Sequence, residues 1–279
     1  MQLFAPAKIN LRFKILRRRE DGFHEIETLM VAISLRDELT IEPNDEEGMA
    51  FSCDDPSLPA DENNLVLRAA RRFFAEIKAE PKVRIALRKK IPHGAGLGGG
   101  SSDAASTLLG LNALHGQPLP PARLTSVAAE IGSDVPFFVC ASAARCRGRG
   151  EIVEPIAALP RWPLLLLKPE FGVPTPWAYG GWASARPLPD LDYGVQSLGD
   201  VLLENDLERP VFEKYIFLAH LKSWLRRQPE VAAAMLSGSG STMFAVLKQA
   251  DGAEVLAKRA RAELDPTLWT CAAHVDASL

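Results

Sequence analysis

The chain has 279 residues, of which 47% are hydrophobic and 24% are charged, and its formal net charge is -3. This composition is typical of a globular protein with one large or two modest domains. The acidic balance argues against a nucleic-acid binder, because such proteins usually carry a basic stripe. A lysine and an asparagine interrupt the N-terminal apolar stretch, so we expect no signal sequence, no membrane span and a cytoplasmic location.

Few side chains group in patterns that are typical of ion-binding sites. The four cysteines show no C-x-x-C spacing and lie near no histidine pair; they are Cys53, Cys140, Cys146 and Cys271. The sequence therefore predicts reduced thiols and no structural zinc site. Arginine-rich runs at residues 17–19 and 145–149 are more typical of a solvated face, although either could help to hold an anionic ligand.

The first 43 residues predict β-strands, followed by a helix. Residues 9–16, INLRFKIL, alternate apolar and polar side chains at period two, a turn follows at Asp21-Gly22, and residues 28–43 continue the pattern. After a turn-rich stretch, Asn63 or Asn64 can cap an amphipathic helix that Pro81 ends. Its apolar face consists of Val66, Ala69, Ala70, Phe73, Phe74 and Ile77.

The middle of the chain predicts a strand, a glycine-rich loop and two helices. Residues 82–92 form the strand that leads into the loop. Residues 101–114 then form a helix, which Ser101 or Ser102 caps. A second helix begins near Pro121, because proline is tolerated in the first turn.

The remaining sequence predicts a second lobe. Residues 135–140, VPFFVC, are predicted as a short strand, and the prolines around residues 156–163 mark a boundary. Mixed strand and helix patterns follow, with a second glycine-rich loop at residues 236–247, LSGSGSTMFAVL. The fold class is therefore α+β, with two lobes that each carry a glycine-rich loop.

The first loop, IPHGAGLGGGSSDAAS at residues 91–106, has the composition of a phosphate-binding loop, although a flexible turn without a ligand is an alternative. A helix after such a loop exposes unpaired N–H groups at the positive end of its dipole. The glycines fit the G-x-G-x-x-G pattern, but residues 104–129 lack the acidic residue that a dinucleotide fold needs to hold the ribose. Gly100 stands where a Walker P-loop has its lysine. We therefore expect a phosphate loop of another kind.

The segment PHGAGLGGGSSDAA resembles the ATP-binding motif of the GHMP small-molecule kinases, whose general form is Pro-x-x-x-Gly-Leu-Gly-Ser-Ser-Ala. The additional Gly99 and Gly100 make it similar to the branch that phosphorylates 4-diphosphocytidyl-2-C-methyl-D-erythritol in non-mevalonate isoprenoid biosynthesis. Seven further segments resemble motifs of this branch in the same order: PAKINL, REDGFHEIETLM, IGSDVPFF, GRGEIVEPI, VPTPWAY, LENDLE and LSGSGSTMF. The resemblance therefore covers nearly the whole chain.

This resemblance implies a two-lobed GHMP kinase fold. Residues 1–158 would form an N-terminal ATP-binding lobe like ribosomal protein S5, and residues 159–279 a C-terminal ferredoxin-like α/β lobe, with the active site in the cleft between them. It also implies an ATP-dependent kinase that phosphorylates the 2-hydroxyl of 4-diphosphocytidyl-2-C-methyl-D-erythritol, with Mg²⁺ accompanying ATP. The expected partners are these two small molecules, with no nucleic acid and no membrane.

The resemblance also assigns roles to individual side chains. Asp134 matches the catalytic aspartate that accepts or orients the hydroxyl proton, and Lys8 matches the catalytic lysine that favours the developing alkoxide. The implied ATP-binding residues are Pro92, His93, Gly94, Ala95, Gly96, Leu97, Gly98, Gly99, Gly100, Ser101 and Ser102. The implied substrate-binding residues are Asn10, Phe23, His24, Thr175, Tyr179, Gly238 and Gly240, with Asp206 a further candidate.

Within the substrate-binding set, the family pattern gives each aromatic residue a task. His24 matches the residue that reads the edge of cytosine, and Tyr179 matches the ring on the opposite face of the base. Phe23 replaces the usual tyrosine, so ring stacking is retained and any hydroxyl contact is lost. Asn10 shares a strand face with Lys8, because strand side chains alternate.

Two other functions are compatible with the motifs. Another GHMP kinase, of the homoserine or mevalonate type, would share the glycine loop, although the DGFH segment favours a cytidine-bearing substrate. An S5-like lobe is also compatible with an RNA-binding module. The acidic net charge and the lack of interleaved basic and aromatic residues argue against that module.

Overall fold

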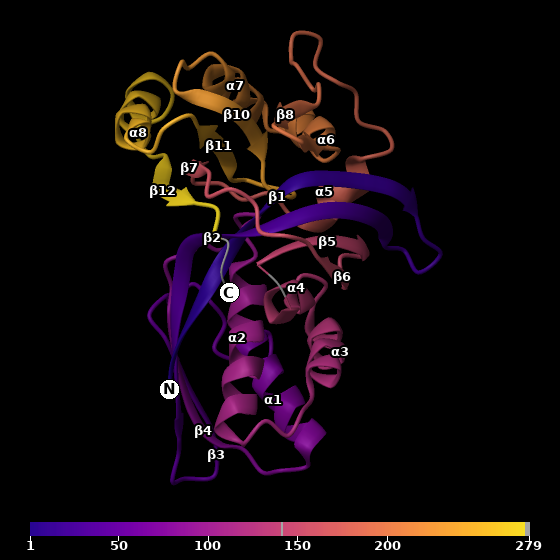
Figure 1. Cartoon of the computed structure of the whole chain (residues 1–279), viewed down its shortest axis with the longest axis vertical. Coiled ribbons are helices and arrows are strands. Elements are labelled where there is room, and N and C mark those ends of the chain that lie inside the picture. Colours follow the sequence, from indigo (N-terminus) through magenta and orange to yellow (C-terminus); the bar gives the residue numbers. More distant parts are fainter. Residues whose placement is uncertain (141, 277–279) are drawn as a thin grey trace.

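The structure, a computed structural model, describes residues 1–140 and 142–276, arranged in two lobes that meet along a long pair of strands (Figure 1). The first part of the chain contains β1 (Gln2–Arg18), β2 (His24–Pro43), β3 (Gly48–Cys53), α1 (Leu65–Ile77), β4 (Lys82–Arg88), α2 (Gly99–Leu114), α3 (Pro121–Ile131), α4 (Val135–Cys140), β5 (Ala143–Gly148) and β6 (Ile152–Pro155). The second part contains β7 (Pro163–Lys168), α5 (Thr175–Gly181), β8 (Gln196–Leu198), β9 (Val201–Asn205), α6 (Glu208–Lys214), α7 (Ile216–Arg226), β10 (Val231–Leu236), β11 (Met243–Leu247), α8 (Gly252–Glu263) and β12 (Trp269–His274). None of the helices in these described ranges is both long and apolar enough to pass through a bilayer.

The hairpin of β1 and β2 forms the centre of an eight-stranded sheet of order β3-β4-β2-β1-β9-β8, to which β5 and β6 are attached through β2. These strands confirm the prediction from the alternating pattern. β1 runs between the two lobes, so its side chains are buried on both faces from residue 5 to residue 11. Ile9 belongs to an apolar cluster with Leu166 of the C-terminal lobe, while Lys8 and Asn10 alternate onto the opposite face.

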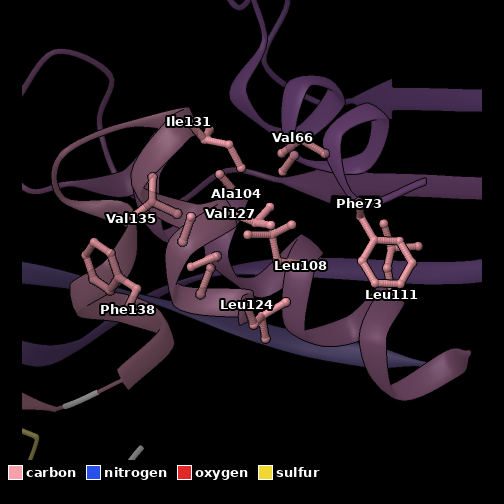
Figure 2. Packing of buried hydrophobic residues seen from close by; sticks show 14 of the residues in the cluster. Val66, Phe73, Ala104, Leu108, Leu111, Leu124, Val127, Ile131, Val135 and Phe138 are labelled. Atoms are coloured by element: carbon pink, nitrogen blue, oxygen red, sulfur yellow. The ribbon is translucent and has the colours of Figure 1, made fainter. Parts of the chain in front are cut away.

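The helices α1 to α4 pack together over the N-terminal part of the sheet. Figure 2 shows their shared core: Val66 and Phe73 of α1, Ala104, Leu108 and Leu111 of α2, Leu124, Val127 and Ile131 of α3, and Val135 and Phe138 of α4. Each buried valine, leucine, isoleucine or phenylalanine side chain stabilises the fold by roughly 1.5–3 kcal/mol relative to an exposed one. Asn64 caps α1 as predicted, because its Oδ1 accepts a hydrogen bond of 2.9 Å from the N–H of Val66.

Two predictions for the region after the first glycine loop are wrong. α2 begins at Gly99 after an N-cap at Gly98, and no side chain of the described residues caps it, so neither Ser101 nor Ser102 has that role. Residues 135–140 form the helix α4 and not a strand. A short apolar run is compatible with either structure, and here Pro136 lies in the first turn while the apolar side chains fill the space beside α2 and α3.

The C-terminal lobe is built on an antiparallel sheet of order β10-β11-β7-β12. Apart from β8 and β9, which belong to the eight-stranded sheet, the chain order of strand, helices, two strands, helix and strand gives the ferredoxin-like arrangement. This order confirms the expected fold of this lobe. The second glycine-rich loop, residues 237–242, joins β10 to β11. This connection brings the loop toward β1 and the first glycine loop.

The lobes are not separated by a simple cut in the chain. The segment between β6 and β7 lies where the sequence predicts a boundary. However, β9 pairs in parallel with β1, with Arg12 opposite Glu204 and Phe13 opposite Asn205. Sheet pairing therefore crosses the expected division after residue 158, which remains a prediction.

Candidate active site

A cavity of about 860 Å³ opens where the two glycine-rich loops meet, and three groups of residues line it. The first group is the loop at residues 92–101 with the neighbouring Asn63 and Leu65. The second consists of polar side chains, among them Lys8 and Asp134. The third is mainly aromatic and includes Phe23, His24, Tyr179 and Trp182. The cavity can therefore hold a phosphate, a reacting hydroxyl and a ring together.

The two glycine loops touch each other directly. Gly96 has φ +75° and lies so close to the second loop that a Cβ there would be 2.2 Å from the carbonyl oxygen of Ser237. Ser237 Oγ donates to the carbonyl of Gly96 at 3.0 Å, and the N–H of Thr242 donates to the carbonyl of Ala95 at 3.2 Å. Only glycine satisfies both the backbone angle and the available space at position 96.

The first loop delivers the N-terminus of α2 to the cavity. Gly98, at φ +69°, turns the chain, and residues 99–101 of the first turn line the cavity wall. The first N–H groups of a helix have no partner within the helix and lie at the positive end of its dipole. This wall is therefore suited to bind the oxygens of a phosphate.

Lys8 is held in place by a chain of hydrogen bonds on the hairpin. Its buried Nζ donates to Asn10 Oδ1 at 2.7 Å and to the carbonyl of Gly96 at 3.0 Å. Asn10 Nδ2 in turn donates to Thr28 Oγ1 at 2.8 Å, and Thr28 Oγ1 donates to the carbonyl of Arg12 at 2.7 Å. The ammonium group therefore has a fixed direction before any ligand binds.

Asp134 faces Lys8 across the cavity. One carboxylate oxygen lies 3.6 Å from Lys8 Nζ, and the side chains are 34% and 5% exposed, respectively. Asp134 directly precedes α4, so the helix fixes its backbone while the carboxylate remains open to the cavity. The pair combines an accessible proton acceptor with a buried positive charge.

The aromatic group surrounds His24. The His24 ring lies 5.3 Å from the Tyr179 ring and 6.0 Å from the Trp182 ring, measured between centroids. Burial, assisted by the charge of Arg18, lowers the pKa of His24, so the imidazole is neutral near pH 7 and offers one donor and one acceptor. Burial also raises the pKa of Tyr179. Phe23 is half exposed, and the Arg149 guanidinium lies over its ring at 4.9 Å.

Comparison with known proteins shows the family of this chain. Residues 64–142 match the family described as GHMP kinases N terminal domain, and residues 195–265 match GHMP kinases C terminal. A 4-diphosphocytidyl-2-C-methyl-D-erythritol kinase of Methylacidiphilum infernorum is 40% identical over 95% of this chain and 93% of its own. The kinase of the same name from Synechococcus elongatus is 37% identical over 96% of this chain and 94% of its own. The chain belongs to the GHMP kinase family.

Two solved structures share the fold of this chain. The crystal structure of a 4-(cytidine 5'-diphospho)-2C-methyl-D-erythritol kinase is 36% identical, covers 99% of this chain and 100% of its own, and has a TM-score of 0.80. A homoserine kinase from Cytophaga hutchinsonii covers 99% of this chain with a TM-score of 0.70 at 20% identity. The family and the two-lobed fold that the sequence motifs imply are therefore confirmed.

The structure brings most of the predicted GHMP kinase site residues to one cavity. Both predicted catalytic residues line it, as do the following predicted ligand-binding residues: Asn10, Phe23, His24, Pro92, His93, Gly94, Ala95, Gly96, Leu97, Gly98, Gly99, Gly100, Ser101, Thr175, Tyr179 and Gly238. Ser102 and Gly240 are not among the described residues that line it. The Ser102 side chain turns into the protein beneath the loop and is fully buried. Its Oγ has no hydrogen-bond partner in the described part of the chain.

Asp206 has a structural position that differs from the expected one. Its N–H donates to the carbonyl of Phe13 at 2.9 Å, and its Oδ2 accepts a hydrogen bond of 2.9 Å from the N–H of Ile15. It is also absent from the described lining of the cavity. Asp206 therefore fastens the segment after β9 to β1, and its carboxylate is already engaged with the backbone.

The cavity wall also includes polar residues that the sequence motifs do not indicate, among them Thr28, Lys89 and Asp103. Thr28 is fully buried at an inward position of β2, in phase with the buried Met30, and a polar residue at such a position is the signal that could have identified it. Lys89 Nζ lies 2.5 Å from Asp37 and 2.7 Å from Asp103, whereas the neighbouring Lys90 is half exposed. Nothing in the sequence distinguishes the two lysines.

The cluster of Lys89, Asp37 and Asp103 places two carboxylates around one ammonium group beneath the first loop. Burial raises the pKa of Asp103; Lys89 opposes this shift and Asp37 reinforces it. Asp37 also accepts hydrogen bonds from the N–H groups of Lys90 and Ile91, at 2.5 and 2.8 Å. The cluster therefore ties the chain before the phosphate loop to β2.

Proposed function

We propose that the protein transfers the γ-phosphoryl group of ATP to the 2-hydroxyl of 4-diphosphocytidyl-2-C-methyl-D-erythritol. The observation that carries this proposal is the position of Lys8 and Asp134 between a helix N-terminus suited to phosphate and an aromatic group suited to a base, all in one cavity. Relatives named for this kinase, at 35–40% identity over nearly the whole chain, support it.

ATP would bind along the first glycine loop. The backbone N–H groups at the start of α2 would hold its terminal phosphates. Leu58, Asn63 and Leu65 line the same cavity next to this loop and offer apolar contact and one amide group to the adenine base. This arrangement would place the γ-phosphate near Lys8.

The chemical step needs a deprotonated oxygen and stabilised charge. The 2-hydroxyl oxygen forms a bond to the γ-phosphorus, and the bond from this phosphorus to the bridging oxygen of ADP breaks. Asp134 would accept the hydroxyl proton, and such a positioned base typically contributes 10²–10⁴-fold. Lys8 would stabilise negative charge that develops on the attacking oxygen and the transferred group, because its ammonium is already fixed by Asn10.

The cytidine of the substrate would bind at the aromatic group. A neutral His24 can present a donor and an acceptor to the edge of cytosine. Phe23 and Tyr179 offer ring faces, and stacking of a base on an aromatic side chain contributes about 1–3 kcal/mol. Phe23 has its other face against Arg149, so one face remains for the base.

Magnesium would reach this site together with ATP. Mg²⁺ keeps several waters and is usually bound by one or two carboxylates and the substrate phosphates. The described residues contain no group of three metal-ligating side chains, but the cavity offers the hydroxyl of Ser101 on the phosphate loop, which fits an ion that the nucleotide carries with most of its waters. When bound, the ion would neutralise charge on the phosphates.

A coupled assay of ADP release tests the function. We expect turnover with 4-diphosphocytidyl-2-C-methyl-D-erythritol and ATP, and a new phosphate monoester in the ³¹P NMR spectrum of the product. Methylerythritol phosphate retains the reacting hydroxyl but lacks cytidine, so it should react very poorly. Homoserine and mevalonate serve as controls for other alcohols. Preference for either control, or equal use of methylerythritol phosphate, would show that the assigned substrate is wrong.

A further inference from the structure

The side chain of Asn205, the last residue of β9, uses its full amide to hold the second glycine loop. Asn205 is 7% exposed. Its Nδ2 donates to the carbonyl of Leu236 at 2.9 Å and to the carbonyl of Gly238 at 2.8 Å. Its Oδ1 accepts a hydrogen bond of 2.9 Å from the N–H of Leu207. Both amide hydrogens therefore bind carbonyls of the segment in which β10 ends and the loop begins.

The loop segment that Asn205 holds lies against the polar centre of the cavity. A Cβ at Gly238, where φ is +56°, would be 3.1 Å from Asn10 Oδ1 and 3.5 Å from Lys8 Nζ. Gly238 and Ser239 also line the cavity. A shift of this loop would therefore change its distance from the Lys8 ammonium and from any phosphate beside it.

Asn205 is itself fixed to the strand that carries Lys8. It pairs with Phe13 of β1, and Asp206 is secured to the same strand by one hydrogen bond from its backbone N–H and one to its side-chain Oδ2. One rigid strand therefore supports the ammonium through Lys8, and the loop through β9 and Asn205. Both sides of the reacting centre are therefore attached to β1.

We propose that Asn205 is a positioning residue for phosphoryl transfer, whose amide sets the distance between the loop at residues 237–242 and Lys8. The proposal rests on the function assigned above to the cavity. It also explains why a buried asparagine stands in the LENDLE segment: only a side chain with two donors and one acceptor satisfies two carbonyls and one N–H. An aspartate of the same shape would place a third acceptor against the two carbonyls.

The test compares Asn205→Asp with a matched control, Asn112→Asp. Asn112 is 8% exposed, donates to the carbonyl of Leu119 and accepts from its N–H, both at 3.0 Å, and is not among the described residues that line the cavity. Both changes remove a buried amide donor. We expect Asn205→Asp to lower kcat by roughly 10²-fold, since misplacement by about 1 Å has that effect, while the KM for ATP rises less. Asn112→Asp should lose stability but keep its kcat.

Two further measurements keep the outcome decisive. Asn205→Ser retains one donor in a smaller side chain and should fold, with a kcat between those of the wild type and Asn205→Asp. Hydrogen exchange of the amides at residues 237–242 should be faster in Asn205→Asp and unchanged in Asn112→Asp, a readout that needs no substrate. If both asparagine variants lose kcat equally, or if loop exchange does not change, Asn205 has no positioning role. Absence of turnover in the wild type would instead refute the assigned substrate, and the exchange result would still decide the role of Asn205.

Discussion

Gly96→Ala tests whether the contact between the two glycine loops is needed for catalysis. The new Cβ would lie 2.2 Å from the carbonyl oxygen of Ser237, whereas ordinary contacts begin at 3.4 Å. The loops must therefore separate by about 1 Å, and a misplacement of this size can cost roughly 10² in rate. The same movement would weaken the hydrogen bonds that the Gly96 carbonyl accepts from Lys8 and Ser237.

The structure offers a control for the strain of the backbone alone. Gly116 has φ +76°, against +75° for Gly96, and a Cβ there would meet nothing within 4 Å. At either position, an alanine with a left-handed backbone conformation destabilises the folded state by about 1–2 kcal/mol. Gly96→Ala adds the clash, which for overpacked sites costs about 1–3 kcal/mol more. The difference in the free energy of unfolding between the two variants therefore measures the clash.

Both variants are measured in the coupled ADP-release assay and in urea unfolding. We expect Gly116→Ala to lose only stability and to retain the wild-type kcat. Gly96→Ala should lose more stability and about two orders of magnitude in kcat, as the displacement implies. Equal stability and equal kcat in the two variants would refute the reasoning, because the loops would then accommodate the methyl group without moving the reacting groups.

Three further predictions follow from the site. Asp134→Asn keeps the shape and removes the proton acceptor, so kcat should fall by roughly 10²–10⁴ while the affinity for ATP is retained. His24→Ala should reduce kcat/KM for the cytidine-bearing alcohol far more than for methylerythritol phosphate, because only the cytidine-bearing alcohol uses the base site. Tyr179→Phe should change kcat/KM little, since stacking needs only the ring. Asp103→Asn should alter the pH dependence of stability, because the pKa of Asp103 is raised in the folded state. Protonation of Asp103 stabilises the folded state fully below the usual carboxyl pKa, and this stabilisation is lost as the pH rises through the folded-state pKa. The free energy of unfolding of the wild type, relative to Asp103→Asn, should therefore fall between about pH 4 and the raised pKa of about 7, by at most about 1.4 kcal/mol per pH unit.

Each of these predictions has an outcome that contradicts it. Near-normal turnover of Asp134→Asn would remove this residue from the mechanism. A proportional loss on both alcohols in His24→Ala would show that the histidine supports the fold and does not read the base. A stability difference that stays constant or grows with pH in the Asp103→Asn comparison would contradict the direction of the pKa shift.

Local signals in the sequence were sufficient for much of the fold. Alternation in residues 9–16 and 28–43 predicted β1 and β2, and one apolar face with an asparagine before it predicted α1 and its cap. These signals are readable because strand and helix periodicities repeat within a few residues. The motifs around both glycine loops likewise led to the GHMP kinase family, which the comparisons confirm.

Other features depended on contacts between distant segments. The run at residues 135–140 became a helix because the space beside α2 and α3 accepts its apolar side chains, which periodicity in so short a run cannot reveal. The same limit applies to the serines after the first loop: only the course of the chain into α2 decides that Ser101 lines the cavity while Ser102 is buried.

The sequence by itself determined which residue types were available for catalysis, and the tertiary structure decided how they are held. Lys8 and Asp134 could be named from their motifs, but their 3.6 Å separation arises only when α2 and α3 hold α4 so that the residue before it lies beside Lys8. Two supports of the site, the carboxylates around Lys89 and the amide of Asn205, have roles that no local sequence signature reveals. Each forms hydrogen bonds with polar groups that are far away in the chain. Those groups require a partner in the protein only because folding has excluded water from them.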